Sequence, residues 1–324
     1  MSAAPTSTSG ELLLIVDPIH PVGTERLRAG YDVILPEGWE TSPRLEETTI
    51  LVVRTTELPE ALLARMPNLK AIVKHGAGVD NIPIPYATTR GIAVANTPGG
   101  NNSTAVAEGA VALMLALLRQ VREMDELVRA GRFAERWRIR LGDLTGGKVG
   151  LIGFGRIARY VAKICSAGFG AEVAAYDPMV SAEDMRAAGV EPMDLRSVMG
   201  RDIVSIHTPL TPETRNLIST EQLSWMRPHA VIVNCSRGGI IDEGALVQAL
   251  ESNAIAGAGI DVFEAEPPPA DHPLFALPNA ILSPHVAGVT EAGMKGMALH
   301  VAEVVDTIAT GGQPATTLNP EVFA

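Results

Sequence analysis

Short apolar runs alternate with helix-like segments along most of the chain, and this alternation limits the possible folds more than any other feature. Four runs in the first hundred residues indicate buried strands: Leu12–Val16, Ile50–Val53, Ala71–Val73 and Ile92–Ala95. Helix-like pieces such as Glu60–Met66 separate them. Because strands that alternate with helices are typical of βαβ units, the pattern predicts an α/β fold with a parallel sheet.

A second series of the same kind begins at Lys148. Six further strands are expected, at Val149–Ile152, Val173–Tyr176, Ile203–His207, Val231–Asn234, Gly257–Asp261 and Ala280–Ser283. A final helix is expected from Thr290 to about Thr310. Because 324 residues are about twice the usual size of one domain, we expect two unequal α/β domains with parallel sheets.

The segment between the two series is apolar at first and basic later. From Thr104 to about Gly131 it predicts one long helix that crosses between the domains, because Ser103 or Thr104 can cap its start and Gly131 can end it. The stretch from Arg132 to Gly146 is basic and irregular, contains Trp137, and indicates an arm or linker.

Composition and charge narrow the classes of partner. The formal net charge is −11, which disfavours nucleic acid and anionic membrane surfaces as partners. Cys165 and Cys235 are the two cysteines, so no disulfide framework is expected and a reducing compartment fits. Met1–Gly10 lacks the features of a signal peptide, and the apolar run Gly109–Leu118 is too short to span a bilayer. We expect a cytoplasmic protein without a metal site.

A glycine turn opens the second series. Gly153, Gly155 and Ala158 satisfy G-x-G-x-x-G/A between a predicted strand and a predicted helix. Gly153 allows the sharp turn, Gly155 lets a pyrophosphate approach the backbone, and Ala158 allows close packing of the helix. The helix start at Arg156 and Ile157 then offers N–H groups to the phosphates. The turn predicts a dinucleotide site.

Asp177 supports this prediction, because it ends the next predicted strand. It follows Gly155 by 22 residues, which is near the spacing expected of the acid that binds the ribose hydroxyls. Since a carboxylate there repels a 2′-phosphate, we expect NAD rather than NADP. The alternative interpretation is an Asp that only forms a turn before Pro178.

Three polar residues follow predicted strands in the second half: Arg237, Glu266 and His285. The carboxyl ends of strands in an open α/β sheet line the ligand crevice, so all three side chains can converge on the nicotinamide end of the cofactor. Each alone has a structural interpretation, as a loop charge or a structural histidine.

Several segments, in this order, resemble the D-isomer-specific 2-hydroxyacid dehydrogenase family, which includes phosphoglycerate dehydrogenase, glyoxylate/hydroxypyruvate reductase and D-lactate dehydrogenase. The matching segments run from His75 to His285: 75–82 (HGAGVDNI), 96–99 (NTPG), the glycine turn, 207–211 (HTPLT), 236–239 (SRGG), 261–267 (DVFEAEP) and 283–285 (SPH). Because the chain ends soon after the predicted final helix, we expect a short form without a regulatory domain.

The resemblance implies the following roles. His285 is the acid and base that exchanges a proton with the substrate oxygen, and Glu266 pairs with it and holds it protonated. Arg237 binds the substrate carboxylate and polarises the carbonyl, which suits its planar fork of donors. The backbone of Ala77 and Gly78 binds the other side of the carboxylate.

The remaining assignments concern the cofactor and the substrate tail. Asp261 is expected to hold the nicotinamide carboxamide. The other expected cofactor contacts, beyond the glycine turn, Arg156, Ile157 and Asp177, are His207, Thr208, Pro209, Thr214, Cys235, Ser236, His285 and Gly288. Arg54 is a further candidate for the substrate tail, and a substrate contact of His75 stays open.

The resemblance also implies a domain order. It gives a substrate-binding domain at residues 1–102 plus 291–324 and an NAD-binding Rossmann domain at residues 103–290, both with Rossmann-like or flavodoxin-like sheets. The substrate then binds in the cleft between the domains, which close over it, and the crossing points act as hinges. A homodimer through the nucleotide domain is implied, with 132–146 as a candidate contact.

Three positions depart from the family pattern without removing a catalytic group. Ala158 replaces the third glycine, Ala287 stands where the family often has glycine and is expected to narrow the site slightly, and Pro83 stands where an acid is common.

The expected function is therefore hydride transfer between NADH and a small 2-keto acid or D-2-hydroxy acid. The alternative is a corepressor-like protein that senses NADH on the same scaffold. Formate dehydrogenase is a second rival, but that branch has glutamine in place of the acid partner of the histidine, so Glu266 argues against it. The particular acid and the physiological direction stay open.

Overall fold

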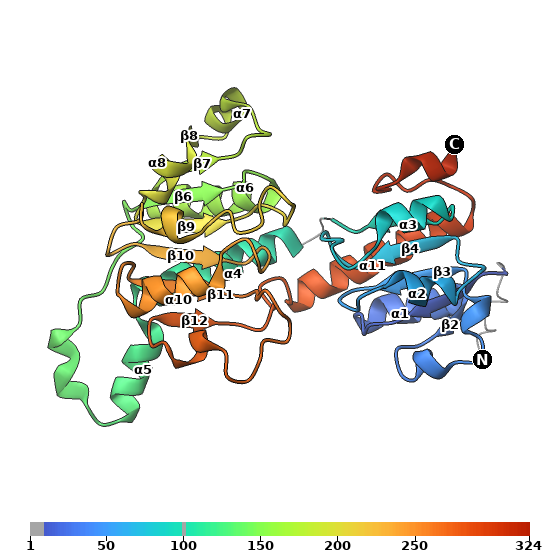
Figure 1. Cartoon of the computed structure of the whole chain (residues 1–324), viewed down its shortest axis with the longest axis horizontal. Helices are drawn as coiled ribbons and strands as arrows, with labels where there is room; N and C mark the ends of the chain where they lie inside the picture. Colours follow the sequence, from blue (N-terminus) through green and yellow to red (C-terminus); the bar gives the residue numbers. More distant parts are fainter. Residues whose placement is uncertain (1–9, 99–101) are drawn as a thin grey trace. The chain divides into compact units, whose positions relative to one another are not determined.

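The computed structural model describes residues 10–98 and 102–324. The chain divides into two compact units: unit 1 is Met1–Asn102 with Val289–Ala324, and unit 2 is Ser103–Gly288. Each unit has its own parallel sheet (Figure 1). The α/β class expected from the sequence is confirmed.

Unit 1 contains a five-stranded parallel sheet in the order β2-β1-β3-β4-β5. Its strands are β1 (Leu12–Ile15), β2 (Asp32–Ile34), β3 (Ile50–Val53), β4 (Ala71–Lys74) and β5 (Ala93–Asn96). Its helices are α1 (Pro21–Gly30), α2 (Glu60–Ala64), α3 (Ile84–Thr89) and α11 (Glu291–Ala309). One face of the sheet packs on α1 and α11, and the other on α2 and α3. A side chain at Gly23 in α1 would meet Ala298 of α11 at 2.7 Å, so these two helices pack with their backbones close.

Unit 2 contains a seven-stranded parallel sheet in the order β12-β11-β10-β9-β6-β7-β8. Its strands are β6 (Lys148–Ile152), β7 (Glu172–Tyr176), β8 (Glu191–Pro192), β9 (Ile203–Ile206), β10 (Val231–Asn234), β11 (Gly257–Ile260) and β12 (Ala280–Leu282). Its helices are α4 (Asn102–Leu118), α5 (Val121–Arg129), α6 (Arg156–Lys163), α7 (Ala182–Ala187), α8 (Leu195–Met199), α9 (Thr220–Leu223) and α10 (Glu243–Glu251).

Alternate residues of these strands enter two separate cores, because successive side chains of a strand point to opposite faces. Val231 and Val233 of β10 pack with α4 and α6, whereas Ile232 packs with α8, α9 and α10. Since both faces are covered, the strands are apolar throughout, which is why they stand out in the sequence.

The strand order of unit 2 reverses at β6. β9 pairs with one side of β6 and β7 with the other. In open α/β sheets, ligands bind outside the carboxyl ends of the strands at such a reversal. We therefore expect the ligand-binding residues of unit 2 in the loops that follow β6, β7, β9, β10, β11 and β12.

All ten strands predicted from the sequence are present, with ends that differ by at most one residue. Two strands were missed: β2, which is only partly buried, and β8, which has two residues. The final helix runs Glu291–Ala309, close to the predicted range.

The prediction of one long helix from Thr104 to Gly131 is wrong. The segment forms two helices, α4 and α5, with a bend of 54° between them, and Gln120 at the break has a positive φ of 47°. The returning chain supplies the reason: the Gly142 N–H donates to the Leu118 carbonyl at 2.8 Å, and the Gln120 side chain donates to the Arg140 carbonyl at 3.0 Å. These tertiary contacts replace the hydrogen bonds of a continuous helix.

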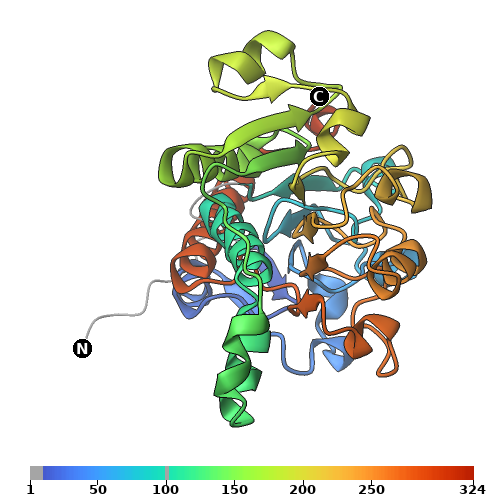
Figure 2. The ribbon, with the colours of Figure 1, turned by 90° about the vertical axis from the view of Figure 1, so that its left-hand side faces the viewer.

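Beyond the break, α5 and the segment after it (green) extend away from the seven-stranded sheet in both views (Figures 1 and 2). Phe133–Arg138 forms a short 3₁₀ helix in this segment. In the described ranges 10–98 and 102–324, no single helix is long and apolar enough to cross a membrane, although α4 and α5 together pass by length and composition.

Candidate active site

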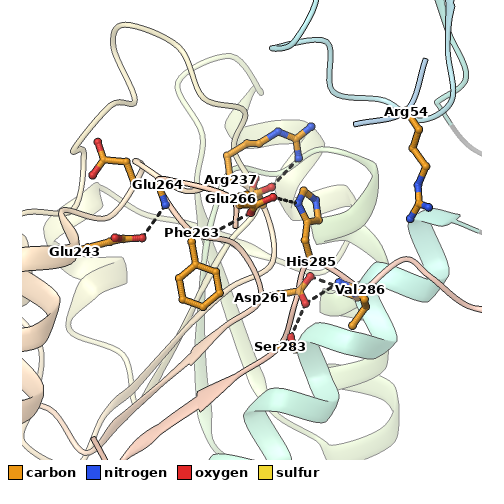
Figure 3. Close-up of polar contacts among 12 residues, drawn as sticks. Arg54, Arg237, Glu243, Asp261, Phe263, Glu264, Glu266, Ser283, His285 and Val286 are labelled. Carbon is orange, nitrogen blue, oxygen red and sulfur yellow. Dashed lines mark hydrogen bonds and ion pairs between the residues drawn. The ribbon is translucent and has the colours of Figure 1, made fainter. Parts of the chain in front are cut away.

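Arg237, Glu266 and His285 follow three neighbouring strands of unit 2. Arg237 comes after β10, Glu266 after β11 and His285 after β12. β11 pairs in parallel with both β10 and β12. The carboxyl ends of parallel strands meet at one edge of the sheet, so the three side chains gather there (Figure 3).

Glu266 and His285 form a direct pair. His285 Nδ1 donates to Glu266 Oε2 at 2.7 Å, and the second carboxylate oxygen of Glu266 accepts from the Phe263 N–H at 3.0 Å. The side chains are 44% and 38% exposed for His285 and Glu266 respectively. Because Nδ1 faces the carboxylate, Nε2 is the nitrogen that can exchange a proton with a ligand.

The Glu266 carboxyl group is ionised at neutral pH. Burial raises its pKa, but the hydrogen bonds from His285 and from the Phe263 N–H, together with the charges of His285 and Arg237, lower the pKa below its ordinary value. An ionised carboxylate beside an imidazole favours the protonated imidazole. The pair can therefore hold and release a proton.

Asp261 organises the backbone around His285. Its side chain accepts hydrogen bonds from the Val286 and Ala287 N–H groups at 2.9 and 3.0 Å and from the Ser283 hydroxyl (Figure 3). Its carbonyl also accepts from the His285 N–H at 2.7 Å. The residue is 1% exposed. These bonds hold His285 at a positive φ of 53°. The expected contact of Asp261 with the carboxamide stays a prediction.

Arg237 lies in a loop that touches the Glu266 loop. The Asn234 side chain donates to the Arg237 carbonyl at 2.8 Å, and the Arg237 guanidinium donates to the Ser236 carbonyl at 2.7 Å. A Cβ atom at Gly238 would lie 1.9 Å from the Phe263 carbonyl oxygen. Only glycine allows this approach, which sets the Arg237 and Glu266 loops against each other.

The glycine turn after β6 has the shape that a pyrophosphate requires. Gly153 has a φ of +88°, and a Cβ there would meet the His207 carbonyl at 2.8 Å. By contrast, a Cβ at Gly155 would enter open space, in front of the start of α6 at Arg156 and Ile157. Ala158 is fully buried against the sheet. The residues present therefore fit a bound dinucleotide phosphate.

Asp177 lies beside this turn. Its side chain accepts from the Phe154 N–H of the glycine turn at 2.7 Å and from the Met179 N–H at 2.8 Å. The bond from Met179 closes the turn at Asp177 that the alternative, structural interpretation expected. The bond from Phe154 brings the same carboxylate to the glycine turn. The two interpretations are therefore compatible.

Hydrogen bonds connect the other residues expected to contact the cofactor, which lie in the loops after β9 and β10. The Thr214 hydroxyl donates to the Pro209 carbonyl at 2.6 Å, and the Ser236 hydroxyl donates to the Thr208 carbonyl. Burial lowers the pKa of His207 to about 4, so its ring is neutral at pH 7. Burial, with the charge of Asp261, raises the pKa of the Cys235 thiol to about 12, so Cys235 stays a protonated thiol.

Two residues beyond His285 also belong to this edge. Ala287 packs against α4, where a Cβ at Gly109 would meet the Ala287 Cβ at 2.9 Å. Gly288 ends unit 2. The expected narrowing of the site by Ala287 stays a prediction.

The expected substrate contacts of unit 1 follow β3 and β4, which are neighbours in its sheet. Asp17 accepts from the Arg54 N–H at 2.6 Å, and Lys74 Nζ donates to the Arg54 carbonyl at 2.6 Å. The Asn96 side chain donates to the Ala77 carbonyl at 2.8 Å, which supports the loop containing Gly78. Gly99 of the NTPG motif lies outside the described residues.

His75 is 3% exposed, and neither ring nitrogen has a hydrogen-bond partner among the described residues. Burial, with the charges of Arg54 and Lys74, lowers its pKa to about 4. Its contact with substrate stays open.

An apolar cavity of about 360 Å³ lies beside the Glu266–His285 pair. Besides this pair, its wall contains Phe263, Pro267, Pro268, Phe275, Leu282, Ser283 and Pro284. An apolar wall lowers the local dielectric constant on one side of the pair, which strengthens the electrostatic interaction within it.

Sequence reasoning assigned no role to three residues that shape this site. Ser283, quoted only as part of the SPH segment, donates to Asp261, whereas Glu243 accepts from the Glu264 N–H and His272 binds Glu243. The only sequence signal of Glu243 and His272 is a polar residue at a helix start, which many residues share.

Residues 111–287 match the family described as D-isomer specific 2-hydroxyacid dehydrogenase, NAD binding domain. The chain is 37% identical over 305 residues to a D-3-phosphoglycerate dehydrogenase of Archaeoglobus fulgidus, covering 92% of this chain but only 57% of that relative. It is also 37% identical over 325 residues to a glyoxylate reductase of Thermococcus litoralis, covering 96% of this chain and 97% of the relative.

The fold matches that of a D-lactate dehydrogenase from Aquifex aeolicus, solved with NAD and lactic acid. The TM-score is 0.85 at 26% sequence identity, over 95% of this chain and 99% of that one. Together with the glycine turn and the strand-end residues described above, these similarities show that the chain belongs to the D-isomer specific 2-hydroxyacid dehydrogenase family and contains its NAD binding domain.

Proposed function

We propose that this protein transfers a hydride between NADH and a small 2-keto acid or the corresponding D-2-hydroxy acid. The observation that carries the proposal is the 2.7 Å contact between His285 Nδ1 and Glu266 Oε2. Glu266 follows β11, which pairs with β10, the strand that precedes Arg237. This arrangement provides a proton donor and a carboxylate-binding cation at one sheet edge, which are the two groups that reduction of a keto acid requires. The names of the similar reductases and dehydrogenases support the same chemistry.

Bound NADH would supply the hydride. Arg237 would bind the substrate carboxylate with its planar donors and polarise the keto group. His285 Nε2 would give its proton to the keto oxygen, while Glu266 stabilises the protonated ring from the Nδ1 side. In the reverse direction, His285 would take the proton from the hydroxyl group.

NAD is the proposed form of the cofactor. The Asp177 carboxylate follows the end of β7 and accepts a hydrogen bond from the glycine turn. It can also accept hydrogen bonds from both hydroxyl groups of the cofactor ribose. A phosphate at the 2′ position would meet this negative charge.

The proposed roles of the chain segments follow the family. Residues 103–290 would bind the cofactor, and residues 1–102 plus 291–324 would bind the substrate through Arg54, Ala77 and Gly78. The acid itself is left open among small 2-keto acids.

We further propose a homodimer formed through unit 2, at the arm of residues 132–146 and the adjoining helix α5. Val128 of α5 is 57% exposed, and Phe133 and Trp137 of the arm are 59% and 81% exposed. The Arg136 guanidinium stacks on the rings of Phe133 and Trp137. Large apolar side chains exposed together are typical of protein interfaces.

We also propose that the protein is cytoplasmic. Its two cysteines, Cys165 and Cys235, are buried and unpaired, which fits a reducing compartment. Recovery of the chain with the secreted proteins of its cell would contradict this location.

Consumption of NADH with glyoxylate, hydroxypyruvate, pyruvate, phosphohydroxypyruvate and bulkier keto acids tests the function. At least one acid should be reduced. His285→Ala should lower turnover by about 10²–10⁴-fold, the usual contribution of a positioned acid–base group. Arg237→Ala should lower turnover by about 10²–10³-fold, the usual contribution of a donor that stabilises developing charge. NADH binding, measured by fluorescence titration, should change little. Inactivity on all of these acids would favour the NADH-sensing alternative, and full turnover in either variant would refute its assigned role.

The cofactor preference is tested by Asp177→Ala. Removing the carboxylate removes both the ribose contact and the repulsion of a 2′-phosphate, so the ratio of kcat/KM for NADH over NADPH should fall by about tenfold or more, equivalent to a loss of about 1.4 kcal/mol. The ratio is measured with one keto acid at saturation. A wild-type enzyme that already prefers NADPH would show that the assignment is wrong.

The dimer is tested by sedimentation velocity. The wild type should sediment at twice the 34.2 kDa mass of one chain, and the charged variant Trp137→Asp should shift towards one chain mass. Met179→Asp is the matched control, because Met179 is 90% exposed but lies outside the arm. A monomeric wild type, or equal shifts in both variants, would contradict an arm-mediated dimer.

A further inference from the structure

A second carboxylate–histidine pair, Glu243 with His272, supports the loop that contains Glu266. His272 Nε2 lies 3.0 Å from Glu243 Oε2, and their side chains are only 8% and 20% exposed. Glu243 is the first residue of α10, and His272 precedes a short 3₁₀ helix at Pro273–Ala276. Both are therefore anchored in secondary structure outside the loop.

The hydrogen bonds fix the direction of this pair. His272 Nδ1 accepts from the Leu274 N–H at 3.3 Å, so the ring proton is on Nε2 and is donated to Glu243. His272 cannot turn its ring over without losing one of these two bonds. The histidine therefore holds one oxygen of the carboxylate in place.

The other oxygen of Glu243 reaches the Glu266 loop. Glu243 Oε1 accepts from the Glu264 N–H at 2.7 Å (Figure 3). The neighbouring amide, the Phe263 N–H, donates to Glu266. Two consecutive amides of one turn are thus bound by two carboxylates, that of Glu243, which pairs with His272, and that of Glu266, which pairs with His285.

Ring packing holds the same turn. The Phe263 ring meets the His272 ring edge-on, with centroids 5.6 Å apart and an angle of 79°, and it meets the Phe275 ring at 6.4 Å and 81°. Phe263 is 7% exposed. His272 therefore contacts the turn twice, through Glu243 to the backbone and through its ring to the side chain.

We propose that Glu243, held by His272, is a positioning residue for catalysis: it fixes the 263–266 turn so that the Glu266 carboxylate meets His285. The proposal rests on the proposed hydride-transfer function. Its geometry is a relay from His272 through Glu243 and the two amides to Glu266 and His285. Glu243 touches neither substrate nor cofactor in this role.

A purely structural role is the competing explanation, because an acid in the first turn stabilises a helix. However, Asp242 already caps α10 by accepting from the Ala245 N–H at 2.9 Å. Both oxygens of Glu243 bind groups outside α10. The contacts of Glu243 therefore serve the turn rather than its own helix.

Glu243→Gln tests the proposal. The amide has one oxygen for two donors, His272 Nε2–H and the Glu264 N–H, so its NH₂ group must face one of them. The variant therefore loses either the bond to the turn or the bond from His272 that fixes the side chain. We expect kcat for keto-acid reduction to fall by about tenfold, as when the hydrogen-bond partner of a functional group is removed. The KM for the keto acid and the Kd for NADH should change by less than about twofold.

Glu264→Gln is the matched control. It makes the same carboxylate-to-amide change one position along the turn and keeps the backbone N–H that Glu243 binds. The Glu264 side chain is 55% exposed, and its Oε1 lies 3.9 Å from Nη1 of the exposed Arg215 side chain. It should leave kcat, KM and thermal stability unchanged.

A double-mutant cycle with Glu266→Gln separates positioning from general stability. If Glu243 acts through Glu266, Glu243→Gln should lower kcat by less than about twofold once Glu266 is Gln. A full tenfold loss in that background, or equal kcat in Glu243→Gln and Glu264→Gln, would overturn the proposal. If Glu243→Gln does not fold, His272→Gln takes its place with the same expected loss and the same cycle. Inactivity of the wild type would instead refute the proposed function.

Discussion

The buried carboxylate of Asp261 is the interaction on which the site depends most. Its backbone joins β10 through the Asn234 carbonyl, and its side chain binds Ser283, Val286 and Ala287 beyond β12. One residue therefore ties together the ends of three strands that precede Arg237, Glu266 and His285. Since backbone N–H groups satisfy the buried charge, they also fix the conformation of the loop that they belong to.

The fold was largely predictable because both sheets are covered on both faces. A strand such as Ile50–Val53 is apolar at every position, and its limits are visible as a change in composition. β2 and β8 escaped prediction because they lie at sheet edges, are short and are only partly buried. The break between α4 and α5 depends on hydrogen bonds with Arg140 and Gly142, which lie about 20 residues further along the chain, so the local sequence pattern could not indicate it.

The candidate site was predictable where chemistry and strand ends coincide. Arg237 and His285 each come three residues after the end of an apolar strand, and parallel pairing of the strands then brings them to one edge. The residues that support the Glu266 loop, Glu243 and His272, could not be predicted. An acid at a helix start, such as Glu243, has the same sequence signature whether it stabilises its own helix or binds a loop from another element. Only the positions of both its carboxylate oxygens separate these roles.

The central claim is that the Glu266 carboxylate keeps the proton of His285 available for reduction. It is tested most directly by kcat for keto-acid reduction at pH 7 in the wild type and in Glu266→Gln. The amide keeps the size of the side chain but removes the negative charge that faces His285 Nδ1 at 2.7 Å. The account predicts that kcat falls by about tenfold or more in the variant, while the Kd for NADH changes little. Equal kcat in the two proteins would contradict it.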